Sequence, residues 1–171
     1  KYGMEFRRAY WDETPDADLI ARHERQIFPL LHRRALFAGV ENFLLYDFYT
    51  PEGHVNEDVF AFSNRLGDEK ALVIYHNRFA ETRGWIKTSV GFLEKKGGER
   101  RIVQRALGEG LGLRRDPTTF VIYRDLVDGL EYLQPTMEIH DKGLFFELRA
   151  YQTHVFLDFR EVTDDANGTY R

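Results

Sequence analysis

The chain has 171 residues, a length that fits one domain, and its 43% hydrophobic content can fill a core. Its 24 basic and 28 acidic side chains are interspersed and give a formal net charge of -4, which argues against binding to nucleic acid or to a membrane surface. Cysteine is absent, which excludes disulfides, thiolate metal sites and cysteine nucleophiles and permits a reducing cytoplasm as the location.

The N-terminal part, residues 1–49, is predicted to be a loop, a helix and a strand-like run. Thr14 as N-cap and Pro15 at the first helical position predict a helix that ends near Arg34. Pro29 should kink this helix or restart it. Apolar residues recur at spacings of three and four, which predicts one buried stripe, and such a helix needs a packing partner: Leu19, Ile20, His23, Ile27, Leu30 and Leu31.

Residues 50–162 are predicted to be mostly strands. The first pair is a hairpin, residues 58–65 and 70–77, in which Gly67 supplies the positive φ of a tight turn. A strand at 83–92 and a charged loop at 94–101 follow, and then a short helix predicted from the spacing of Ile102, Val103, Ala106, Leu107 and Leu111. Further strands are expected at 118–124, 130–133, 144–150 and 152–162, before a polar tail at 163–171. The predicted fold is therefore mainly β: an antiparallel Greek-key β-sandwich with an N-terminal amphipathic helix and a short inserted helix.

No motif in the chain predicts catalysis, a metal site or a cofactor. The six histidines show no paired spacing with a carboxylate, and His23 on the apolar stripe is expected to be a core histidine. The glycines from Gly108 to Gly112 have the wrong spacing for a dinucleotide-binding loop and indicate the end of a helix. No serine lies in a nucleophile-elbow pattern.

The hairpin carries a family resemblance. Phe62 and Arg65 before the turn, and Val73 and Asn77 after it, resemble the first hairpin of the C-terminal β-sandwich in the α-amylase family of glycoside hydrolases, from which Asn64 and His76 depart. Residues 143–156 are similar to the closing strands of that domain. Residues 2–5 and the helix at 15–34 are similar to the last loop and last helix of the family's catalytic barrel.

The resemblance implies a non-catalytic C-terminal portion that packs on and stabilises a catalytic barrel, with the barrel upstream of Lys1 in the same polypeptide and an α-glucan as substrate. Position 1 is lysine rather than methionine, so we expect a processed chain or part of a longer one. Family members carry their catalytic carboxylates on barrel strands, and no pair of acids here can be assigned to that role.

The resemblance also implies substrate contacts at the rim of the active-site cleft, where the opening loop places Arg7, Arg8, Tyr10 and Trp11. Trp85 is a further candidate as a ring platform for sugar, with core packing as the alternative. A second hypothesis for the whole chain is an autonomous carbohydrate-binding or protein-interaction β-sandwich, with the helix folded back on its own sheet. Neither hypothesis requires a cofactor.

Overall fold

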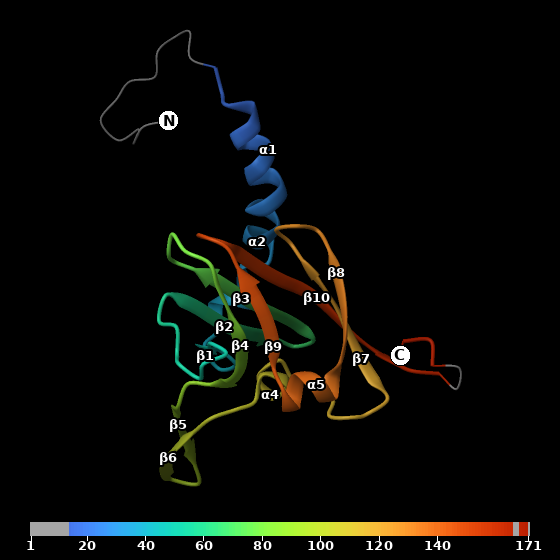
Figure 1. Cartoon of the computed structure of the whole chain (residues 1–171). Coiled ribbons are helices and arrows are strands. Elements are labelled where there is room, and N and C mark those ends of the chain that lie inside the picture. Colours follow the sequence, from blue (N-terminus) through green and yellow to red (C-terminus); the bar gives the residue numbers. More distant parts are fainter. Residues whose placement is uncertain (1–13, 166–167, 171) are drawn as a thin grey trace. The chain divides into compact units, whose positions relative to one another are not determined.

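The computed structural model describes residues 14–165 and 168–170. The chain divides into two compact units, Lys1–Arg34 and Ala35–Arg171 (Figure 1). We refer to them as the helical unit and the sandwich unit. The strand that we assigned to the N-terminal part of the chain lies after this division and belongs to the sandwich unit.

The helical unit contains α1 (Ala17–Gln26) and α2 (Phe28–His32). The predicted N-cap was wrong: the Asp16 carboxylate, not Thr14, accepts the Leu19 backbone N–H at 3.2 Å. A carboxylate at this position also interacts favourably with the helix dipole. The predicted restart is confirmed, because Pro29 lies in the first turn of α2, where a missing N–H has no cost.

Most of the remaining described residues form strands and short helices in the sandwich unit. These elements are α3 (Arg34–Ala38), β1 (Leu44–Tyr49), β2 (Val59–Leu66), β3 (Glu69–His76), β4 (Thr82–Ser89), β5 (Phe92–Lys96), β6 (Glu99–Val103), α4 (Leu107–Gly110), β7 (Thr119–Asp125), β8 (Glu131–Pro135), α5 (Thr136–Asp141), β9 (Leu144–Leu148) and β10 (Thr153–Thr163).

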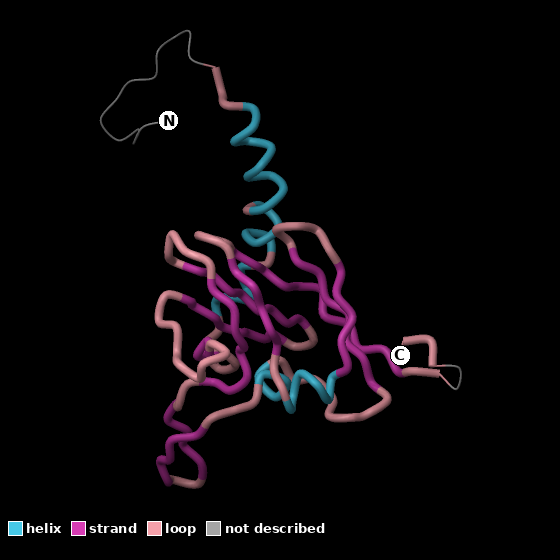
Figure 2. Tube along the Cα trace, in the orientation of Figure 1, coloured by secondary structure: helices cyan, strands magenta, loops and turns pink. Residues whose placement is uncertain are grey.

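Eight of the strands form one antiparallel sheet in the order β8-β7-β10-β3-β2-β1-β4-β9, and β5 and β6 form a separate pair. The large sheet curls, so that strands from its two ends face each other (Figure 2). Phe146 on β9 thus contacts Phe156 on β10, with ring centroids 5.8 Å apart. The fold is mainly β, as predicted, and the curled antiparallel sheet is consistent with a β-sandwich.

The predicted first hairpin is confirmed as β2 and β3. Its register pairs Ala61 with Ile74 across the strands, and Gly67 takes a φ of +59° in the turn. Inward side chains from both strands enter the core.

A buried tyrosine of β1 also lies in this core. The hydroxyl of Tyr46 lies 2.7 Å from Ser63 Oγ, and burial raises the pKa of Tyr46 to about 12, so this phenol is neutral at physiological pH.

The segment between β4 and β7 differs from the prediction. Residues 94–101 belong to the β5–β6 hairpin rather than to a loop, and Ile102 lies on β6 with 78% of its surface exposed. The inserted helix is only α4, and its end is confirmed by Gly112 at a φ of +64°. The helical spacing of Ile102 was therefore coincidental, because cross-strand pairing of β6 with β5 determines its conformation.

Candidate functional site

The described part of the helical unit exposes its apolar stripe. The sequence predicts a buried stripe here, but no residue of α1 or α2 is buried. Ile20 is 44% exposed, Ile27 42% and Leu31 55%, and Leu19 and Phe28 are similarly exposed. We call these five residues the helix stripe. Apolar side chains gathered on one helix face without a cover are typical of an interface.

His23 does not belong to a core. It is exposed on α1, and its Nδ1 lies 2.9 Å from the carbonyl oxygen of Leu19 one turn earlier. A contact of this kind is local to the helix and orders no distant segment. The prediction of a core histidine at this position was wrong, because the stripe on which it rested is not covered within the described residues.

The outer side of the large sheet carries a second apolar surface. Leu45 on β1 pairs with Phe62 on β2, and Phe60 follows two residues away on the same face. Phe43 contacts Phe62, with ring centroids 5.5 Å apart. We call these four residues the outer apolar face. Three of them are 40–53% exposed.

This surface is unusual for a sheet that is solvated on its outer side. The inward residues of β1, including Leu44 and Phe48, are buried in the core, whereas Leu45 is exposed on the other side, so the start of β1 is apolar on both faces. An antiparallel sheet with one solvated face normally alternates apolar and polar residues. Apolar side chains gathered on the solvent side of a sheet are typical of a packing surface.

The hairpin residues quoted for the family resemblance have structural roles. The Asn64 amide donates to the Gly39 carbonyl oxygen at 2.7 Å, and the Arg65 guanidinium donates to Asn42 at 3.2 Å. Both contacts hold the segment after α3 against β2. Asn64, a departure from the family pattern, is thus accounted for by packing within this chain.

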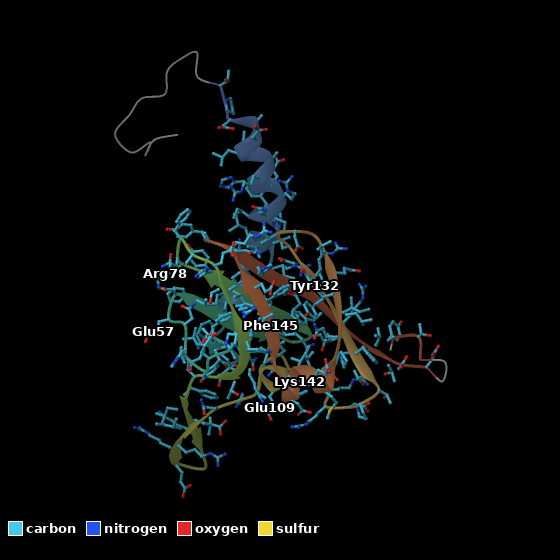
Figure 3. All side chains as sticks on the ribbon, viewed as in Figure 1. Glu57, Arg78, Glu109, Tyr132, Lys142 and Phe145 are labelled. Carbon is cyan, nitrogen blue, oxygen red and sulfur yellow. The ribbon has the colours of Figure 1, made fainter. Side chains whose placement is uncertain are left out.

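Trp85 lies on the outer side of β4 rather than in the core. It is 37% exposed, and its ring contacts that of Phe145, the opposite residue on β9, with centroids 4.7 Å apart. Phe145 is labelled in Figure 3. The contact of Trp85 with a substrate stays a prediction. The other four predicted contact residues, Arg7, Arg8, Tyr10 and Trp11, lie outside the described residues, so the structure does not place them near Trp85.

One group of side chains within the described ranges has metal-ligand chemistry: Asp125, Asp128 and His154. Asp125 is fully buried, and its carboxylate accepts backbone N–H groups of Val127 and Val155 as well as the His154 Nδ1–H. These hydrogen bonds satisfy the oxygens of the buried Asp125 carboxylate, so its burial is explained without a bound cation. Sequence reasoning missed this network because its members are about 30 residues apart in the chain, far beyond the spacing of a local motif.

Comparison of the sequence with protein-family models and with curated proteins gives no match. Among the described residues, no helix has the length and apolar character needed to cross a bilayer. The two apolar surfaces are therefore the observations from which a function is best argued.

Proposed function

We propose that this chain is the non-catalytic C-terminal β-sandwich portion of an α-amylase-family glycoside hydrolase that acts on α-glucans. In this proposal the helix stripe and the outer apolar face pack on the catalytic barrel of the same polypeptide and stabilise it. The observation that carries the proposal is the exposure of the helix stripe, five large apolar side chains on α1, α2 and the residue between them. The family resemblance supplies the identity of the partner.

Burial of the helix stripe would contribute favourable free energy to this contact. Each residue of the helix stripe is about half exposed, and burying the remaining apolar area contributes on the order of 1 kcal/mol per side chain. The stripe is flanked by charged residues such as Arg22 and Glu24, so it has the apolar centre and polar rim of an interface.

We propose a cytoplasmic location for the parent enzyme, supported by the absence of cysteine.

The proposal predicts that the 171-residue chain self-associates. Without a barrel, the helix stripe of one copy is expected to pack on that of another, because this removes apolar surface from water. A variant with Ile20→Gln, Ile27→Gln and Leu31→Gln retains residues of good helix propensity and should associate more weakly than the unchanged chain, because only its outer apolar face remains to drive association. Sedimentation velocity over a range of micromolar concentrations measures the difference.

A matched control changes three exposed apolar residues outside both surfaces: Val40→Gln, Ile102→Gln and Leu130→Gln. This control should associate as the unchanged chain does. If the unchanged chain is a monomer throughout the range, or if both variants lose association equally, the helix stripe is not an interface and the proposal fails.

A further inference from the structure

A pocket opens on the outer side of β4, beside the edge strand β9. Its volume is about 520 Å³, and small-molecule sites typically have volumes of about 300–1,000 Å³. The lining comes from β1, β4, the segment after β6 and the residue after α5: Tyr49, Trp85, Lys87, Thr88, Gln104 and Lys142. All of these residues belong to the sandwich unit, so the pocket is formed within that unit.

Three aromatic side chains cross the sheet in a row at this pocket. Register places Tyr49 on β1 and Phe145 on β9 opposite Trp85, which lies between them on β4. The ring centroids of Trp85 and Phe145 are 4.7 Å apart, and the Tyr49 hydroxyl donates to Asp47 Oδ2 at 3.4 Å. Trp85 is nevertheless 37% exposed. The indole is thus flanked on both sides and keeps a surface on which a planar ring can stack.

The charged side chains that line the pocket are both cations, Lys87 and Lys142. No described acidic residue lines it, although acids outnumber bases by 28 to 24 in the whole chain. Lys87 has no ion-pair partner among the described residues. Lys142 directly follows α5 and is labelled in Figure 3. It pairs with Glu138 at 3.0 Å, but both side chains are exposed, and such a pair is weak enough for a ligand to replace. The pocket therefore favours an anionic group.

The lining also offers neutral polar groups at fixed positions. The Gln104 side-chain amide donates to the Ser89 carbonyl oxygen at 2.9 Å, which leaves its Oε1 as an acceptor. Thr88 forms a β-bridge with Ala106, and the Ser89 backbone N–H donates to the Arg105 carbonyl oxygen at 2.8 Å. These contacts hold the segment after β6 against the end of β4. An amide and a hydroxyl are thus positioned beside the ring and the two cations.

We propose that this pocket binds a purine nucleoside monophosphate. The purine stacks on Trp85, and the phosphate pairs with Lys87 and Lys142. The Gln104 amide and the Thr88 hydroxyl form hydrogen bonds with the base edge and the ribose hydroxyls. A ligand that uses all three kinds of lining residue needs a planar ring, neutral polar groups and an anionic group, and a nucleotide has all three. The inference does not rest on the proposed barrel contact, because none of these residues belongs to either apolar surface.

The test is isothermal titration calorimetry of the full 171-residue chain with AMP, GMP, the two corresponding nucleosides and ribose 5-phosphate. We expect saturable binding of at least one of the two nucleotides at millimolar concentration or below. The nucleosides lack the phosphate, and ribose 5-phosphate lacks the base. Each of these fragments should therefore bind about tenfold more weakly than the nucleotide, because each loses one part of the contact.

Two variants locate the binding site. Lys87→Gln should weaken nucleotide binding roughly fivefold and leave nucleoside binding unchanged, since one cation near the phosphate is lost. Trp85→Ala should weaken the binding of nucleotide and nucleoside roughly tenfold, since the stacking surface is lost. Lys95→Gln is the matched control, because Lys95 is an exposed lysine on β5 that does not line the pocket. It should bind as the unchanged chain does.

Three results would overturn the proposal. The first is failure of both nucleotides to bind, and the second is a nucleoside or ribose 5-phosphate that binds as tightly as the nucleotide. The third is nucleotide binding that Lys87→Gln leaves unchanged, because the phosphate would then lie elsewhere on the chain. Circular dichroism checks the fold of each variant, and the Lys87→Gln result decides if Trp85→Ala does not fold. Sedimentation of the chain without nucleotide tests the barrel proposal separately, so failure of one proposal leaves the other standing.

Discussion

A Gly143→Ala substitution is expected to lower the free energy of unfolding by more than about 3 kcal/mol. Gly143 follows α5 and has a φ of +75°, where an L side chain costs roughly 1–2 kcal/mol. A Cβ atom there would also overlap the carbonyl oxygen of Ile86 and come within 2.7 Å of the Lys87 Cα. These are backbone atoms of β4, so relief requires a shift of β9 against β4. Urea denaturation followed by circular dichroism measures the loss.

Gly129→Ala is the matched control. Gly129 lies in the β7–β8 turn at a φ of +79°, but nothing lies within 4 Å of the position that its Cβ would take. Its substitution should therefore cost only the backbone strain, roughly 1–2 kcal/mol. Equal losses in the two variants would contradict the close approach of the α5–β9 junction to β4 that the structure shows.

The second large effect is expected from Asp125→Ala, which should lower the free energy of unfolding by about 3 kcal/mol. The substitution removes the acceptor for the Val127 and Val155 N–H groups and for the ring of His154. An unsatisfied buried donor costs about 1–3 kcal/mol, and Asp125 is fully buried. The same denaturation measurement applies.

Asp125→Asn tests whether the effect comes from hydrogen bonding. The asparagine oxygen can still accept from the Val127 and Val155 backbones, and its amide can donate to His154 Nδ1 in the other tautomer. In that tautomer His154 Nε2 carries the proton and no longer accepts from the Gln152 amide, so one hydrogen bond is lost. This variant should lose about 1 kcal/mol. A loss as large as that of the alanine variant would show that the negative charge, rather than the set of acceptors, is what the network requires.

Local structure was predictable from the sequence where local chemistry determines it. The β2–β3 hairpin follows from two β-rich runs around Gly67, and the helix restart follows from Pro29. The prediction failed where short segments depend on pairing or packing. The β5–β6 hairpin has a charged sequence, and α5 is a helix of only six residues for which no signal was recognised.

The surfaces were less predictable than the elements. The helix stripe could be read from its spacing, but its exposure depends on what covers it. The outer apolar face becomes visible only when register places Leu45 beside Phe62. Long-range pairing of β4 with β9 likewise sets Arg83 opposite Glu147. No periodic pattern within either segment indicates that they meet.

The most direct test of the barrel proposal is the mass of the natural protein. An antibody raised against this chain would be used to detect the protein in its source cells, and the mass of the detected species would be read on a calibrated gel and by mass spectrometry. The proposal predicts a polypeptide several times larger than 20.2 kDa, with a catalytic barrel preceding Lys1. A natural product of 20.2 kDa would contradict it, and the chain would then act as an autonomous β-sandwich.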